Sequence, residues 1–481
     1  MMFISSKGFA ASLLSVATAV VLVASPVAAA PTPSPSQTAT PTPSASPSLS
    51  ASPSASPKPS ASPKPTPSPI PFAANSCSAK SALTSKDLGQ LYGYVIDVAS
   101  GKMLINVRGT EATPSASVLK VVTAAAAMVT LPADYRAQTK VFTVPGQPGT
   151  IVLQGGGDHT LSRMTGESFT TYSKPARLEA LASQVLLGWK SDTPISKIIL
   201  DAGFFAGPSY NSAWKLSDRT NGYISHITAL QVDSDRANPD LTSKAYSGYR
   251  STNPVLATGK FFKESLEGLA DTATLVEGKT PTNAVLLTRV NSQPITNWLS
   301  HAISVSDNTE TEFIARHAAR FAGLEPSFAS IEPLAKKALT TLGIDSTGLK
   351  MYDGSGLAQG NRVTAKMIAQ LMTKVANGNL EGNPTLAQME SYLPVAGKTG
   401  TLAGRFNGAN AIARNYVLGK SGYIPGLYSL AGIVKAKDGT RLAYAFFARS
   451  AGGKTVGYAA RPALDSLATR LYQCGFGLKA N

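Results

Sequence analysis

The sequence places a serine and a lysine three residues apart at Ser117-Val-Leu-Lys120. They open an apolar run that continues to Met128, and Pro114-Ser115 upstream is a typical start signal, so we predict a helix beginning near Ser117. Residues three apart share a helix face, which brings the hydroxyl and the amine within reach of each other. Free backbone N–H groups at a helix start can also stabilise developing negative charge. The pattern predicts a serine nucleophile and a lysine base, provided that burial or a nearby positive charge keeps the lysine neutral.

Two other fragments could complete such a site. Ser306-Asp-Asn308 lies between two predicted helices, where a loop can present a hydroxyl and an amide. A Lys-Thr/Ser-Gly sequence occurs twice, at Lys398-Thr-Gly400 and at Lys420-Ser-Gly422. Each fragment is a weak signal alone. A second Ser-x-x-Lys, Ser212-Ala-Trp-Lys215, stands in a turn-rich stretch with no apolar helix after it, so we expect it to be structural.

The elements that must position these side chains come from both ends of the chain. Residues 88–109 predict two strands joined by a turn at Ser100-Gly101, and residues 415–449 predict a three-stranded antiparallel meander. Helical patterns dominate from residue 254, and an amphipathic helix closes the chain. The five strands could form one sheet. The stretch from about 137 to 253 interrupts this pattern with further strands, turns and one helix, so we expect an inserted domain there.

Taken in order, the three motifs resemble those of the serine penicillin-recognising enzymes. More closely, the sequence is similar to the D-alanyl-D-alanine carboxypeptidase/endopeptidase family of class C low-molecular-mass penicillin-binding proteins, over about 400 residues. The 186 positions from Lys120 to Ser306 fit the inserted domain of that family better than the shorter separation in class A β-lactamases. The supporting stretches are Leu153-Gln-Gly-Gly-Gly-Asp158, Leu200-Asp-Ala-Gly-Phe-Phe-Ala-Gly-Pro208, Tyr352-Asp-Gly-Ser-Gly-Leu357, Asn361-Arg362 and Leu393-Pro-Val-Ala-Gly397.

The resemblance implies an α+β fold. This is a penicillin-binding, β-lactamase-like transpeptidase domain, an antiparallel five-stranded sheet flanked by helices, with an inserted, mainly β domain. We expect the catalytic domain at residues 76–136 and 254–481 and the inserted domain at residues 137–253.

The resemblance also implies how acylation proceeds. Ser117 attacks the carbonyl of the penultimate D-Ala and forms an acyl-enzyme, which releases the terminal D-Ala. Lys120 takes the serine proton, and Ser306 helps to pass it to the leaving amine. The implied activity is that of a serine-type D-Ala-D-Ala carboxypeptidase, with DD-endopeptidase activity left open.

A substrate-binding set is implied in the same way. Asn308 holds the substrate amide. Lys420 contributes the positive charge that keeps the base neutral and, with the Ser421 hydroxyl, binds the terminal carboxylate. The backbone N–H groups of Ser117 and Tyr423 form the oxyanion hole. Penicillin mimics the D-Ala-D-Ala end and traps the acyl-enzyme.

Two lysines compete for the place on the catalytic strand. Lys398 belongs to the closer textual match, but residues 402–410 after it predict a loop. Residues 416–424 and 427–434 predict two paired strands, so we favour Lys420 and keep Lys398 as the alternative. Tyr423 stands where the family commonly has threonine, which puts substrate selectivity and activity in question.

The N-terminal residues indicate where the protein works. Residues 1–30 are typical of a secretory signal peptide, with a basic start, an apolar stretch and small residues at the end, and residues 31–75 form a linker rich in proline, serine and threonine. We expect a secreted or cell-wall-associated protein, outside the cytoplasmic membrane, with an uncleaved N-terminal anchor as the alternative. In an oxidising compartment the only two cysteines, Cys77 and Cys474, are expected to form a disulfide.

Charge and motifs limit the other functions. The net charge is +16, and +13 of it lies beyond residue 72, but the basic residues are dispersed, so we expect anionic cell-wall polymers rather than nucleic acid as partners. No HExxH or paired Cys-x-x-Cys motif is present, so we expect no metal or cofactor. The chain has four histidines but no Gly-x-Ser-x-Gly elbow, which argues against a Ser-His-Asp hydrolase.

The expected partners are peptidoglycan stem peptides ending in D-Ala-D-Ala, and β-lactams. A catalytically silent cell-wall or β-lactam-binding protein and a secreted β-lactamase remain as alternatives.

Overall fold

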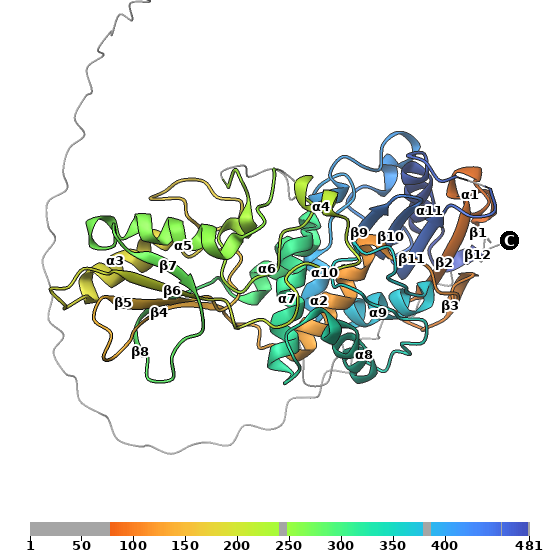
Figure 1. Ribbon diagram of the computed structural model, residues 1–481. Coiled ribbons are helices and arrows are strands. Elements are labelled where there is room, and N and C mark those ends of the chain that lie inside the picture. Colours follow the sequence, from red (N-terminus) through yellow and green to blue (C-terminus); the bar gives the residue numbers. More distant parts are fainter. Residues whose placement is uncertain (1–76, 240–247, 379–385, 454, 480–481) are drawn as a thin grey trace, which may run out of the picture. The chain divides into compact units, whose positions relative to one another are not determined.

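The computed structural model describes residues 77–239, 248–378, 386–453 and 455–479 (Figure 1). The predicted signal peptide and the predicted linker, residues 1–30 and 31–75, therefore lie outside the described residues. Within them, no helix is both long and apolar enough to cross a bilayer.

The first sheet joins the two ends of the described chain. Its strands are β2 (Gln90–Asp97), β3 (Met103–Val107), β9 (Val417–Ile424), β10 (Leu427–Lys435) and β11 (Arg441–Arg449). They run in the order β3-β2-β11-β10-β9, and every neighbouring pair is antiparallel. The sequence-based prediction of one sheet from two N-terminal and three C-terminal strands is confirmed.

This sheet separates two hydrophobic cores. Because side chains alternate along a strand, Phe447 of β11 packs into one core and its neighbour Phe446 into the other. The larger core includes residues of α2 (Leu119–Thr130), α6 (Ile295–Val305), α7 (Asn308–Phe321), α8 (Ile331–Thr341) and α9 (Ala365–Asn377). The smaller core lies under the terminal helix α11 (Ala460–Cys474), so helices cover both faces (Figure 1). The short helices are α1 (Lys80–Leu83), α4 (Leu216–Thr220) and α10 (Met389–Tyr392).

A second sheet of five strands follows α2 in the chain. It contains β4 (Gln138–Thr143), β5 (Thr150–Gln154), β6 (Lys197–Asp201), β7 (Thr274–Glu277) and β8 (Val285–Asn291). The order is β7-β6-β5-β4-β8, with β5, β6 and β7 parallel and β4 antiparallel to both of its neighbours. A third core joins one face of this sheet to α3 (Leu178–Gly188) and α5 (Pro254–Ser265).

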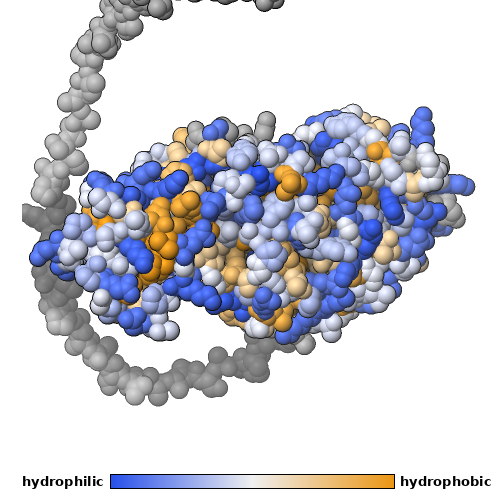
Figure 2. Space-filling view, viewed as in Figure 1, coloured by the Kyte–Doolittle hydropathy of each residue, from blue (hydrophilic) through white to orange (hydrophobic). Residues whose placement is uncertain are grey.

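The opposite face of the second sheet carries one apolar side chain from each strand. In strand order these are Val276, Ile199, Val152, Phe142 and Leu286, and the pairing registers place them side by side in a row. Val276 and Leu286, on the two edge strands, are exposed. Figure 2 shows hydrophobic side chains gathered over this part of the surface.

The second sheet extends past the boundary expected at residue 253. Strands β7 and β8 lie after that residue, and Phe262 of α5 is buried in the same core as Leu178 of α3. A helical pattern shows that α5 exists but not which core it joins. We therefore propose that the inserted region, which we define as residues 137–291, ends near Ser292.

The two ends of the folded region meet. A disulfide joins Cys77 to Cys474, with 5.3 Å between their Cα atoms, so this prediction is confirmed. Next to it, β1 (Cys77–Ser78) pairs in parallel with β12 (Leu478–Lys479).

Candidate active site

Ser117 lies in a tight turn that leads into α2. The turn is a 3₁₀ segment, Ala116–Val118, and α2 begins directly after it. Ala116 has a φ of 46°, a left-handed conformation that costs a non-glycine residue about 1–2 kcal/mol. Strain of this kind persists only where the surroundings enforce it, and it is common next to reactive groups. Here the backbone at Gly356 packs against the Ala116 carbonyl so closely that a Cβ at 356 would collide with it.

Lys120 lies one turn further, fully buried, and its amine is surrounded by acceptors. Nζ donates to Ser117 Oγ at 3.2 Å, to Asn308 Oδ1 at 2.6 Å and to the Ser355 carbonyl at 2.6 Å. The predicted contact between the hydroxyl and the amine is therefore present. The amine also contacts Asn308, which the sequence separates from it by 188 positions.

Burial sets the protonation of this lysine. Loss of solvation lowers the pKa of Lys120 to about 8, although the charges of Asp353, Glu312 and Asp307 act to raise it. Burial also lowers the pKa of Lys420 well below its ordinary value, and the positive charge of Lys120 lowers it further. The family resemblance implied that the charge of Lys420 keeps Lys120 neutral, whereas in the free protein burial is the main cause of the lowered pKa of Lys120.

The Ser-Asp-Asn motif forms the turn between α6 and α7, as predicted. Ser306 is the C-cap of α6 in a left-handed conformation, with a φ of 67°. Asp307 is the N-cap of α7, and its side chain accepts a hydrogen bond from the Glu310 N–H. The Asn308 side chain donates from Nδ2 to the Tyr223 carbonyl at 2.9 Å, so its oxygen faces Lys120.

Strand β9 brings Lys420 to this turn. The fully buried amine donates to Ser306 Oγ at 2.8 Å and to the Ser421 carbonyl at 2.7 Å. The Ser421 hydroxyl donates to Thr401 Oγ1 at 2.9 Å, and Tyr423 is exposed. At Gly422 a Cβ would lie 2.9 Å from the Ser117 nitrogen, so the strand passes close to Ser117 only because this residue has no side chain.

Lys398 does not reach the site. It is exposed in a turn after residues 394–396, which pair with the first half of β9. This pairing leaves the second half of β9, from Lys420 onward, open toward the cleft. The preference for Lys420 thus agrees with the geometry, while Thr401 of the competing segment still lines the cleft.

These side chains meet at a cleft of about 900 Å³. Ser117, Ser306, Asn308, Ser421 and Tyr423 line it, and the amines of both lysines lie buried beneath. Four charged side chains also line the cleft, namely Lys215, Asp218, Arg405 and Arg461. Lys215, from the second Ser-x-x-Lys, thus lines the cleft, whereas Ser212 lies in a turn and does not. Among the described residues lining the cleft there is no histidine.

The roles of two buried acidic residues near Lys120, Asp353 and Glu312, were not predicted from the sequence. Asp353 is buried and accepts hydrogen bonds from Gly356 N, Ala358 N and Asn361 Nδ2, which shapes the loop at residues 353–358. Glu312 accepts from Gly354 N and Ser355 N, and burial and the charge of Asp353 raise its pKa to about 7. The loop in turn presents the Ser355 carbonyl to Lys120. Residues 352–357 served only as support for the family resemblance, because the spacing of these residues does not indicate that the loop faces Lys120.

The sequence profile of the family described as D-Ala-D-Ala carboxypeptidase 3 (S13) matches residues 77–252 and 243–471. The chain belongs to this family. D-Ala-D-Ala carboxypeptidase of the serine type is the activity of this family. In this structure three motifs on separate elements meet at one cleft.

Individual proteins agree with this assignment. Carboxypeptidase DacB of Mycolicibacterium smegmatis is 32% identical over 397 residues, which cover 82% of this chain and 83% of that protein. The crystal structure of penicillin binding protein 4 from Haemophilus influenzae has the same fold, with a TM-score of 0.68, 20% identity and coverage of 82% of this chain and 99% of that one. The same Haemophilus protein complexed with a β-lactam superposes with a TM-score of 0.60 and 19% identity, covering 79% and 95%.

Proposed function

We propose that Ser117 is the nucleophile of a carboxypeptidase that acts on peptidoglycan stem peptides ending in D-Ala-D-Ala. The observation that carries this proposal is a pair of buried lysines, each bonded to a serine hydroxyl at the floor of one cleft. Lys120 contacts Ser117, and Lys420 contacts Ser306. A serine, a base and a second hydroxyl in this order are what acyl transfer to an enzyme requires.

In acylation, neutral Lys120 takes the hydroxyl proton of Ser117 while Oγ bonds to the carbonyl carbon of the penultimate D-Ala. The C–N bond then breaks, and the proton passes through the Ser306 hydroxyl to the leaving D-Ala amine. Water subsequently hydrolyses the ester. Backbone N–H groups of Ser117 and Tyr423 are the proposed donors to the oxyanion.

Lys420 and Ser421 are the proposed ligands of the terminal carboxylate, and Asn308 the ligand of the substrate amide. A bound carboxylate favours the charged form of Lys420. Two ammonium groups in one buried site repel each other, so a charged Lys420 favours a neutral Lys120. Substrate binding would thus help to prepare the base.

The test is to incubate the purified protein with penicillin and map the adduct by mass spectrometry, then to measure D-Ala release from a pentapeptide stem. We expect one adduct, on Ser117, and release of D-Ala. Labelling without release of D-Ala would instead identify a silent β-lactam-binding protein, and rapid hydrolysis of penicillin a β-lactamase.

The size of the cleft favours a second activity on crosslinked stems. A volume of about 900 Å³ is at the upper end of the range for small-molecule sites and exceeds what a D-Ala-D-Ala end fills. We propose that the part of the cleft lined by Lys215, Asp218 and Arg461 accommodates more of a peptide. Incubation with purified crosslinked muropeptides, followed by mass spectrometry, should then show monomers as products.

We also propose that the protein works outside the cytoplasmic membrane, because its family acts on peptidoglycan. N-terminal sequencing of protein recovered from the culture medium or the cell wall should find a mature chain beginning after residue 30.

A further inference from the structure

The turn that carries Ser306 and Asn308 holds a strained conformation. Ser306 has a φ of 67°, where a non-glycine residue is about 1–2 kcal/mol less stable than in a right-handed conformation. Such a turn keeps its shape only if contacts from outside enforce it. The inserted region, residues 137–291 as defined above, supplies several of these contacts.

The strongest contact is a buried ion pair with Asp307. Arg236 Nη2 donates to Asp307 Oδ2 at 3.1 Å, and the two side chains are 0% and 2% exposed. The Tyr172 hydroxyl donates to the same oxygen at 3.2 Å, while Oδ1 accepts from the Glu310 N–H at 3.0 Å. Burial alone would raise the pKa of Asp307, but the charge of Arg236 helps to lower it below its ordinary value.

Arg236 is itself presented by a strained segment. The three residues before it, Asp233, Ser234 and Asp235, all have positive φ values of 51°, 51° and 57°. The segment is fixed at its backbone, where Asp233 N donates to the Leu161 carbonyl and Ser234 N to the His159 carbonyl. Two strained segments therefore meet at one ion pair, a concentration of strain that is typical of functional sites.

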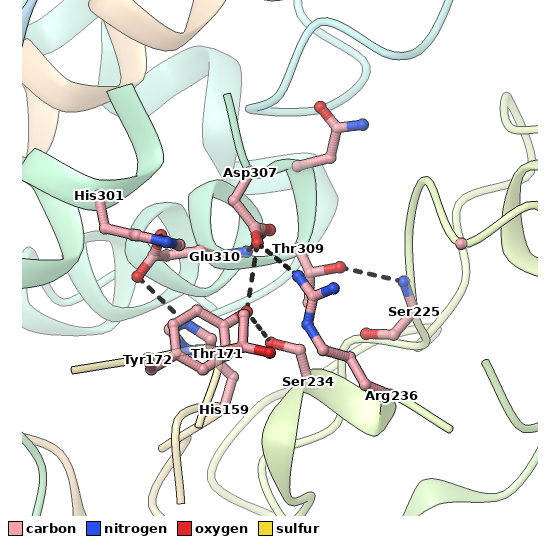
Figure 3. Close-up of polar contacts among 12 residues, drawn as sticks. His159, Thr171, Tyr172, Ser225, Ser234, Arg236, His301, Asp307, Thr309 and Glu310 are labelled. Carbon is pink, nitrogen blue, oxygen red and sulfur yellow. Dashed lines mark hydrogen bonds and ion pairs between the residues drawn. The ribbon is translucent and has the colours of Figure 1, made fainter. Parts of the chain in front are cut away.

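Other groups of the inserted region contact the three residues that follow Asp307 (Figure 3). Ser225 N donates to Thr309 Oγ1 at 3.1 Å, and the Tyr223 carbonyl accepts from Asn308 at 2.9 Å. His159 Nε2 lies 3.4 Å from Glu310 Oε1. The inserted region thus contacts four consecutive residues, from Asp307 to Glu310.

A metal site is the competing interpretation of this cluster. His301, Asp307 and Glu310 place possible ligand atoms within 4.8 Å of one another. However, Asp307 already faces the guanidinium of Arg236, and a positive charge at that position repels a cation. The cluster is therefore better explained as an ion-paired support than as a vacant cation site.

We propose that Arg236 is a positioning residue: through Asp307, it holds the Ser306-Asp-Asn308 turn so that Ser306 faces Lys420 and Asn308 faces Lys120. This inference rests on the proposed roles of Ser306 and Asn308. The inserted region then has a catalytic purpose in addition to lining the cleft. A misplacement of about 1 Å in such groups costs on the order of 10²-fold in rate.

The test measures the second-order rate of acylation by a fluorescent penicillin, together with Tm, for Arg236→Met, Asp307→Asn and the double variant. Asparagine caps helices as well as aspartate does, so Asp307→Asn keeps the cap and loses the charge. Each single variant leaves a buried charge unpaired and should lower both Tm and the acylation rate, the rate by about 10²-fold. The double variant leaves neither charge and should recover Tm, while its rate stays as low as in the single variants.

Arg316→Met is the matched control. Arg316 is also fully buried and lies on α7, but it donates to the carbonyls of Ala206, Pro208 and Pro326. We expect it to lower Tm with less than a threefold change in acylation rate. If Arg236→Met does not fold, Arg236→Lys is the second variant, because lysine keeps the positive charge but lacks the planar guanidinium. We expect this variant to acylate approximately tenfold more slowly at a near-normal Tm.

The proposal is wrong if Arg236→Met acylates at the wild-type rate, if the rate of the double variant recovers along with its Tm, or if Arg316→Met slows acylation as much. Failure of the proposed function gives a different result, because wild-type protein would then either carry no penicillin on Ser117 or carry it without releasing D-Ala from a pentapeptide.

Discussion

Replacing Lys420 with methionine tests the assignment of the catalytic strand. Methionine fills most of the buried volume of lysine but has no amine, so the change removes the contact at 2.8 Å to Ser306 Oγ with little loss of packing. A hydrogen bond to a charged group contributes about 1.5–3 kcal/mol, and the contact with the substrate carboxylate a similar amount. A loss of about 3–6 kcal/mol corresponds to at least 10²-fold in kcat/KM.

The matched control is Lys398→Met. Lys398 belongs to the more literal motif but is exposed in a turn and does not line the cleft, so its variant should stay within about threefold of wild type. The assay is kcat/KM for release of D-Ala from a pentapeptide, with thermal unfolding of both variants measured in parallel. An active Lys420→Met together with an inactive but folded Lys398→Met would refute the strand assignment and the reasoning behind it.

Three further predictions concern Lys120, Ser117 and the disulfide. The rate of acylation should rise as the pH increases through about 8 and then level off, because only neutral Lys120 can accept the serine proton. At pH 7 about one tenth of the protein has a neutral Lys120. A rate that stays constant from pH 6 to 9 would contradict this prediction. Ser117→Ala should abolish penicillin labelling, and a remaining adduct at Ser212 would contradict the assignment. Replacing Cys77 and Cys474 with serine should lower Tm, consistent with a loss of up to about 5 kcal/mol, with the acylation rate at 25 °C unchanged; equal Tm values would show that the bridge adds no stability.

Patterns local to the sequence were sufficient for the strands of the first sheet and for the contact between Ser117 and Lys120. Alternating and continuous apolar runs predicted the strands, and a spacing of three residues predicted that Lys120 contacts Ser117. The strand pattern after residue 415 also separated Lys420 from Lys398, although the latter matched the motif better. In each case the deciding information lay within about ten residues.

Contacts between distant segments could not be predicted in this way. Nothing near Arg236 indicates that it pairs with Asp307, because the pairing depends on how the inserted region packs against α7. The same holds for Glu312, which supports the loop that faces Lys120, and for α5, whose helical pattern did not reveal which core it joins. A side chain whose role depends on contact with a distant residue produces no periodic pattern in its own part of the sequence.

The strand order β3-β2-β11-β10-β9 has a consequence for synthesis. Ribosomes make β2, Ser117 and Lys120 early, whereas β11, the neighbour of β2, and β9, which carries Lys420, come from the last part of the chain. Until then β2 is paired on one side only, with β3, and Ser117 lacks one wall of the cleft. Pairing across so long a separation is slow, and unpaired strand edges are prone to aggregate, so incomplete chains should depend on chaperones. A chain cut short before residue 417 would contain Ser117, Lys120 and the Ser306 turn and still be expected to cleave no peptide.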